Sequence, residues 1–144
     1  MNLFPKKLVI DSSVIVKWLS QQDEDHIIQA NKVLNDVKKG KIELFAPELA
    51  KYEVANAILT GKGIMPSNVK ISLATLFSAP IQFVSETIEL AESSYKFAYE
   101  SGITYYDASF ASLANLLDAP LVTDNPKHQA KVKGIETIPL KDYK

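Results

Sequence analysis

The sequence predicts an α/β fold, namely a three-layer α/β/α sandwich with a mainly parallel central sheet of about five strands. Short apolar runs alternate with longer amphipathic segments along the chain, which is the order expected when helices cover a parallel sheet. The 144 residues suit one compact domain, and no repeat, low-complexity tract or long linker divides them. We therefore expect a single domain over residues 1–144.

Five short apolar segments are predicted to form strands. The first, KKLVID, ends in an acid, and the second, KIELFA, is stopped by Pro47. The third, PIQFVS, ends at Ser85, a plausible cap for the helix that follows. The remaining two are APLVTD and IETIPL. In residue numbers, the five segments cover 6–11, 41–46, 80–85, 119–124 and 135–140.

The segments between these strands show helical spacing of apolar residues. The segment DEDHIIQANKVLNDVKKG carries acids in its first turn and ends in Lys-Lys-Gly, as the helix dipole favours. Pro47 and Pro66 each suit the first turn of a helix. A short helix is also predicted after Pro126. The longer helices are predicted over 12–21, 23–40, 48–61, 65–78, 86–102 and 102–114.

The composition excludes several classes of protein. No segment approaches the roughly 18 apolar residues of a membrane span, and the absence of Cys excludes disulfides and thiolate metal sites. The first residues favour a strand over a signal peptide, so a cytoplasmic location is expected. The net charge is −1 and all 16 basic residues are Lys, so no Arg is available for phosphate contacts. His26 and His128 show no metal-ligand spacing and are interpreted as surface residues.

Two acids directly follow predicted strands. Asp11 comes after KLVI and Asp124 after PLVT, and ligands of open α/β sheets bind at the carboxyl ends of the strands. Asp is also a common turn residue, and the neighbouring Asn125 and Pro126 favour a turn at Asp124. The pattern is therefore compatible with one shared crevice or with two structural turns.

A third acid lies on a helix that is otherwise largely apolar. Glu53 and Asn56 are three residues apart and hence on one face, with Thr60 roughly in line. A polar stripe on a buried helix must find partners, because a lone buried charge is costly. The alternative is that this stripe is simply the face that the helix exposes to water.

The segment GITYYDASFASLA places Asp107 in the first turn of a predicted helix. Thr104 and Asp107 fit the capping box, in which the acid satisfies backbone donors at the start of the helix. The helix dipole would also keep this carboxylate ionised, as a metal ligand must be. Capping and metal binding therefore do not exclude each other.

The four acids indicate a metal site when they are considered together. Two strand ends and two helices can meet in one pocket of a small α/β domain. Carboxylates that lie close together repel one another unless a cation neutralises them. Carboxylate and water oxygens favour Mg²⁺ or Mn²⁺ over Zn²⁺. The four acids are Asp11, Glu53, Asp107 and Asp124.

The sequence resembles a PIN domain along nearly its whole length, and most of all the VapC toxins of prokaryotic toxin–antitoxin pairs. LVIDSSVIVKWL resembles the opening strand with its first acid, and APELAKYEVANAI resembles the Pro-led helix with Glu and Asn. GITYYDASFASLA resembles the most recognisable segment, and APLVTDNPKH the last acidic strand end. The family often has Thr, any residue and then Asp there, so either Asp124 or Asn125 takes the fourth place. The retained charge favours Asp124.

The resemblance implies a metal-dependent endoribonuclease that is the toxin of a VapBC-type pair and hydrolyses RNA phosphodiesters. It implies Mg²⁺ or Mn²⁺ as the cofactor, bound by the four acids named above. It further implies RNA as substrate, a VapB-like antitoxin as partner and a homodimer. Lys127 and Lys131 would steer the RNA backbone. The supporting residues would be Ser13, Asn56, Thr123 and Asn125.

Two other classes of function compete with this one. The first is a non-catalytic PIN-like module that binds RNA or protein, against which the retained acids argue. The second is a receiver-like or hydrolase-like phosphoryl-transfer domain, which usually needs paired acids near the first strand that VIDSSV lacks.

The helices carry more large apolar residues than one small sheet needs to cover it. A contiguous exposed patch of such residues usually marks an interface, here that of the expected homodimer. The alternative is that these side chains complete the core of one chain. The candidates are Val14, Trp18, Leu19, Ile64, Met65, Leu76 and Phe77.

Overall fold

The computed structural model describes residues 3–144 and contains a five-stranded sheet with the strand order β3-β2-β1-β4-β5. Every pair of neighbouring strands is parallel, so the predicted α/β fold is confirmed. Because β1 is central, the chain leaves it in one direction for β2 and β3 and later in the other for β4 and β5. The strands are β1 (Lys6–Ile10), β2 (Ile42–Pro47), β3 (Ile81–Val84), β4 (Leu121–Thr123) and β5 (Thr137–Pro139).

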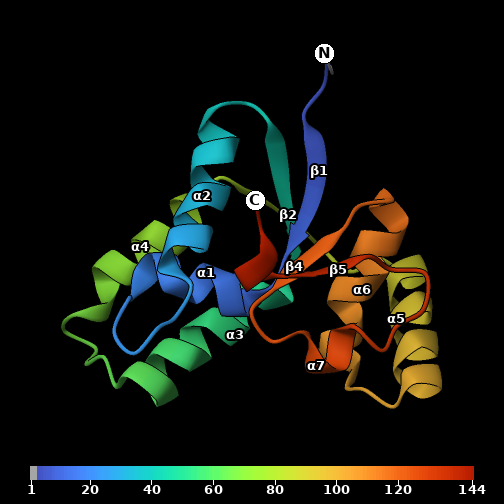
Figure 1. The fold of residues 1–144 in the computed structure, drawn as a ribbon. Helices are drawn as coiled ribbons and strands as arrows, with labels where there is room; N and C mark the ends of the chain where they lie inside the picture. The colour runs from blue at the N-terminus through green and yellow to red at the C-terminus, as the bar shows by residue number, and fades with distance from the viewer. Residues whose placement is uncertain (1–2) are drawn as a thin grey trace.

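Helices cover both faces of this sheet (Figure 1). Helices α5 and α6 lie on one side and α1 to α4 on the other, which gives the predicted three layers. No helix within residues 3–144 combines the length and apolar character needed to cross a membrane. The helices are α1 (Ser12–Leu19), α2 (Ile27–Lys38), α3 (Leu49–Ala57), the π-helical turn η1 (Ile58–Lys62), α4 (Val69–Ser78), α5 (Ile88–Ser101), α6 (Tyr105–Leu117), α7 (Pro126–Gln129) and the 3₁₀ turn η2 (Leu140–Asp142).

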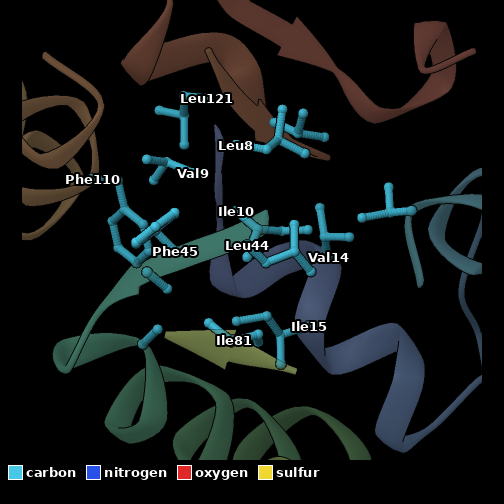
Figure 2. Packing of buried hydrophobic residues seen from close by; sticks show 14 of the residues in the cluster. Leu8, Val9, Ile10, Val14, Ile15, Leu44, Phe45, Ile81, Phe110 and Leu121 are labelled. Carbon is cyan, nitrogen blue, oxygen red and sulfur yellow. The ribbon is translucent and has the colours of Figure 1, made fainter. Parts of the chain in front are cut away.

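The core is built on both faces of the central strand. Successive side chains of a strand point to opposite faces, so Val9 and Ile10 pack against different helices. Figure 2 shows Phe110 of α6 on the side of Val9 and Val14 of α1 on the side of Ile10. All four side chains are at most 1% exposed. This packing fixes β1, and with it the residue that follows β1, between two helical layers.

Most of the longer helices begin later than the sequence predicts, and at three of them a Pro or Ser was expected at the helix start. Pro47 is the last residue of β2 and pairs with β3, and α3 begins after it instead of including it. Pro66 likewise precedes α4 without opening its first turn. Thr87 rather than Ser85 caps α5, since Thr87 Oγ1 accepts a hydrogen bond from the N–H of Leu90 at 3.2 Å. Tertiary pairing of the strand ends outweighs the local preferences of Pro and Ser here.

The predicted apolar patch is exposed only in part. Val14 and Leu76 belong to the buried core, contrary to the prediction, because both pack in the cluster between helices and sheet. Met65 and Phe77 are exposed, as predicted. The acids before α2 also lie outside that helix, which begins at Ile27. The partly buried members of the patch are Trp18, Leu19 and Ile64.

A buried acid of α2 binds the C-terminal segment. Asp36 is 5% exposed, and its Oδ2 accepts hydrogen bonds from Tyr143 Oη and Lys32 Nζ, both at 2.9 Å. Burial alone would raise the pKa of Asp36, but these hydrogen bonds outweigh it and hold the pKa below its usual value.

Replacing Tyr143 with Phe is expected to lower the free energy of unfolding at neutral pH by about 1.5–3 kcal/mol, the range for a hydrogen bond to a charged group. The contribution of ionised Asp36 is present above its unfolded pKa of 3.8 and is lost as pH falls through the lower folded pKa. Denaturant unfolding between about pH 2 and 7 should show the two proteins converging in acid. A constant difference would contradict the prediction, and Tyr95→Phe at an exposed tyrosine is the control.

Candidate metal centre at the carboxyl edge of the sheet

Asp11 is oriented by hydrogen bonds from three different elements. It follows β1 directly and caps α1. Its Oδ2 accepts from the N–H and Oγ of Ser13, at 3.1 and 2.5 Å, and from Thr123 Oγ1 at 3.1 Å. Its Oδ1 accepts from Gln129 Nε2 at 3.0 Å. The turn interpretation of Asp11 is therefore correct, and the cap also fixes where the carboxylate points, which is compatible with a role as a ligand.

Ser13 joins the ends of β1 and β4. Its hydroxyl proton goes to Asp11, and its Oγ accepts a hydrogen bond from the N–H of Asp124 at 3.0 Å. The two strand ends that the sequence singles out are thus adjacent, as β1–β4 pairing requires. Gln129 was not predicted, because nothing in its sequence neighbourhood distinguishes it from a surface residue.

Glu53 of α3 faces the same edge and is half-buried. Its Oε1 accepts a hydrogen bond from Ser12 Oγ at 2.8 Å. Burial raises the pKa of Glu53, and the nearby charges of Asp11 and Asp107 raise it further, although the bond from Ser12 opposes them. Within the stripe, Glu53 is therefore partnered and electrostatically coupled to Asp11 and Asp107. Asn56 and Thr60, by contrast, are exposed to water, as the alternative expected.

Asp107 lies in the first turn of α6, as predicted. Its N–H donates to Thr104 Oγ1 at 3.0 Å, which is one half of the capping box. The other half is not formed, since no hydrogen bond within residues 3–144 involves the Asp107 carboxylate. The carboxylate is therefore free to act on Glu53, whose pKa it raises.

Asp124 differs from the other three acids because a lysine and a histidine of the protein contact it. Its Oδ2 pairs with Lys17 Nζ at 2.9 Å, and its Oδ1 contacts His26 Nδ1 at 2.8 Å. Lys17 is only 1% exposed and also pairs with Glu24 at 2.7 Å. Burial lowers the pKa of Lys17, but Glu24 and Asp124 outweigh it and the pKa is raised. The His26 side chain is 37% exposed, as expected of a surface residue, but its ring also contacts a candidate site residue, which was not predicted.

The remaining predicted site residues have side chains that are exposed to solvent. Exposed side chains belong to Asn56, Asn125, Lys127 and Lys131. The N–H of Asn125 donates to Thr123 Oγ1 at 3.0 Å, which fixes the turn after β4. Lys127 belongs to α7, the helix whose Gln129 contacts Asp11.

The acids do not form a compact multidentate cage. Within residues 3–144, no group of three or more His, Asp or Glu side chains is arranged so that it could hold a metal ion. The chemistry of the donors still suits Mg²⁺, which keeps several water ligands and is usually bound through one or two carboxylates. Burial and the nearby charges of Asp11 and Asp107 raise the pKa of Glu53, and such a group of carboxylates is compatible with a partly hydrated ion.

The sequence profile of the PIN domain matches residues 8–135, nearly the whole chain. This chain belongs to the PIN-domain family. Ribonuclease VapC3 of Pyrobaculum aerophilum is 28% identical over 123 residues, which cover 81% of this chain and 88% of the relative. The resemblance seen in the sequence motifs is thereby confirmed at the level of the family.

Solved structures share the PIN fold at low sequence identity. VapBC2 from Rickettsia felis bound to a DNA fragment from their promoter gives a TM-score of 0.68 at 14% identity, covering 92% of this chain and 98% of that chain. A toxin–antitoxin complex from Klebsiella pneumoniae gives 0.63 at 16% identity, covering 92% and 97%. These likenesses support the order of strands and helices described for this PIN domain.

Replacing Glu53 with Gln is expected to stabilise the metal-free PIN domain at neutral pH by roughly 1 kcal/mol, the size of one charge interaction at about 4 Å in water. The folded pKa of Glu53 lies above the unfolded value of 4.5, so the wild-type protein loses stability as pH rises through this interval. Thermal unfolding in EDTA should show the advantage of Glu53→Gln growing with pH.

Added Mn²⁺ should reverse this order by stabilising the wild-type protein more than the variant. The control is Glu92→Gln, at an exposed position of α5, which should show neither effect. Equal stability of Glu53→Gln and wild type at every pH would refute the proposed repulsion.

Proposed function

We propose that this PIN-domain protein is a Mg²⁺- or Mn²⁺-dependent endoribonuclease and the toxin of a VapBC-type toxin–antitoxin pair. The observation that carries the proposal is that Asp11 after β1, Glu53 of α3 and Asp107 of α6 lie near one another at the carboxyl edge of the sheet, where burial, and then Asp11 and Asp107, raise the pKa of Glu53. Ligands of parallel α/β sheets bind at this edge. A ribonuclease and a toxin–antitoxin complex among the relatives support the same function.

Asp11, Glu53 and Asp107 would hold the ion directly or through water. When bound, the ion supplies a Lewis acid for the phosphodiester and lowers the pKa of a coordinated water. Asp11 is kept in one orientation by its hydrogen bonds, so it serves best as a fixed ligand. Glu53, with its raised pKa, is suited to accept a proton at Oε2, because Ser12 already occupies Oε1.

The fourth acid would act differently. Asp124 would have to exchange Lys17 and His26 for the metal in order to become a ligand. We propose that it instead holds Lys17 and the end of β4 in place, and that Asn125 supplies the neutral oxygen at this position. Lys127 and Lys131, both exposed, would contact the RNA backbone. Asn56 would contact the solvent side of Glu53.

RNA cleavage should require Mg²⁺ or Mn²⁺ and stop in EDTA. Asp107→Asn should lower kcat by at least 10²-fold, the smaller end of the range for loss of a positioned catalytic group, while the protein remains folded. Gel assays on a mixed RNA pool measure cleavage, and Mn²⁺ titration followed by electron paramagnetic resonance measures metal binding separately.

Asp118→Asn, at the exposed opposite end of α6, is the matched control and should keep full activity. Undiminished cleavage in EDTA or by Asp107→Asn would rule out the mechanism. RNA binding without cleavage would favour the non-catalytic module, the alternative supported by the lack of a three-ligand group within residues 3–144.

We further propose that the protein forms a homodimer and binds a VapB-like antitoxin whose C-terminal segment covers the acidic edge. Exposed apolar side chains on η1, α4 and the loop between them support a dimer surface. They are Leu59, Met65, Ile71 and Phe77, each at least 64% exposed. Exposed apolar groups usually mark an interface where they form a contiguous patch, and a dimer would bury the members of this set that face the partner.

Sedimentation at micromolar concentration should give a dimer for the wild-type protein and a monomer for Phe77→Asp, because a charge cannot be buried in an apolar interface without a partner. Ile88→Asp provides the control, since Ile88 is 67% exposed at the start of α5, on the other side of the sheet from α4 (Figure 1). A monomeric wild-type protein would refute the dimer and leave the nuclease proposal intact.

A further inference from the structure

A pocket of about 290 Å³ opens beside the acidic edge of the sheet. Its wall includes Pro47 at the end of β2, Val84 at the end of β3, and side chains of α3, α5 and α6. Leu90 and Leu113 contribute apolar surface. The pocket lies near the lower limit of the volume range typical of small-molecule sites, about 300–1,000 Å³, so it suits one small flat group.

Two tyrosines connect the pocket with the acids. Tyr52 precedes Glu53 on α3, and Tyr106 precedes Asp107 on α6. On each helix, therefore, one residue lines the pocket and the next belongs to the acidic edge. Tyr52 is 73% and Tyr106 59% exposed. Exposed aromatic rings beside a nuclease site are surfaces on which RNA bases stack.

The pocket also contains polar groups without full partners. Ser94 is 1% exposed, and its Oγ has no hydrogen-bond partner within the described part of the chain. Such a buried hydroxyl is unfavourable unless a ligand or water satisfies it. The carboxylates of Glu48 and Glu86 line the same pocket and can accept hydrogen bonds from amino groups.

We propose that this pocket binds one nucleobase of the RNA next to the cleaved phosphodiester, with Tyr52 and Tyr106 stacking on the base and Ser94, Glu48 and Glu86 bonding its edge. The inference rests on the proposed ribonuclease function. Carboxylates accept from the exocyclic amino groups of adenine, cytosine and guanine, which uracil lacks. Uracil offers only its N3–H to these carboxylates, so the pocket favours an amino-bearing base.

Charge favours a base over a phosphate in this pocket. No Lys is found among its lining residues within residues 3–144; Glu86 repels an anion, whereas Glu48 is paired with Lys51 at 2.9 Å. A neutral ring avoids that repulsion, while the phosphate to which it is attached remains at the acidic edge beside Glu53 and Asp107.

Binding of free nucleosides tests the pocket without relying on cleavage. Adenosine, cytidine, guanosine and uridine carry no phosphate, and each is titrated into the whole metal-free protein by NMR. Amide shifts should change around the pocket with the first three, and uridine should bind at least several-fold more weakly. Tyr106→Leu keeps apolar bulk but removes the ring, so it should weaken binding by roughly 5- to 150-fold, which corresponds to about 1–3 kcal/mol of stacking.

The matched control is Tyr99→Leu, at an 84% exposed tyrosine of α5 that does not line the pocket, and it should bind like wild type. Ser94→Ala should weaken binding of the amino-bearing nucleosides with the fold retained. In RNA cleavage, Tyr106→Leu should raise KM by a similar factor without changing Mn²⁺ affinity.

Several results would overturn the pocket proposal. One is the absence of nucleoside binding together with an unchanged KM in Tyr106→Leu, while the nuclease proposal would stand. Conversion of a dimer to a monomer by Tyr106→Leu, again without nucleoside binding, would identify the pocket as an interface between copies.

Nucleoside binding in a protein that fails to cleave RNA would instead support the pocket proposal and reject the nuclease proposal.

Discussion

The hydrogen bonds to Asp11 are the constraint on which the rest of the site depends. Ser13 of α1, Thr123 of β4 and Gln129 of α7 all donate to this one carboxylate at the end of the central strand. Because β1 is held between β2 and β4 and packed on both faces, the carboxylate cannot move without disturbing the sheet. The positions of α3 and α6 then determine how close their own acids come to it.

The candidate site acids differ in whether a basic side chain of the protein pairs with them. Asp124 is neutralised from within by buried Lys17, whose second partner Glu24 is also bound by Lys62 at 3.0 Å. Losing one partner of such a buried pair typically costs 3–5 kcal/mol, so this network mainly holds the segment before α2 against the end of β4. Glu53 and Asp107 have no ion-pair partner within the described residues, which leaves their charge for something outside the chain.

The sequence was sufficient for features that depend on local signals. All five strands, the short helix after Pro126 and the placement of Asp11 and Asp107 follow from apolar runs, Pro and capping residues. Features that depend on distant contacts were missed. The contact between His26 and Asp124 joins residues 98 positions apart, and neither neighbourhood shows it. Pro47 was assigned to the wrong element because pairing of β2 with β3 extends the strand through it.

The central position of β1 also affects when the hydrogen bonds to Asp11 can form during synthesis of the chain. Thr123 and Gln129 lie 112 and 118 residues after Asp11, so a nascent chain that has emerged only as far as α6 lacks both donors. Contacts of such long range form late in folding, because closing the intervening loop costs entropy first. The Asp11 carboxylate is therefore among the last groups to receive all its hydrogen bonds. In a growing polypeptide still attached to the ribosome, the acids have not yet reached their final arrangement.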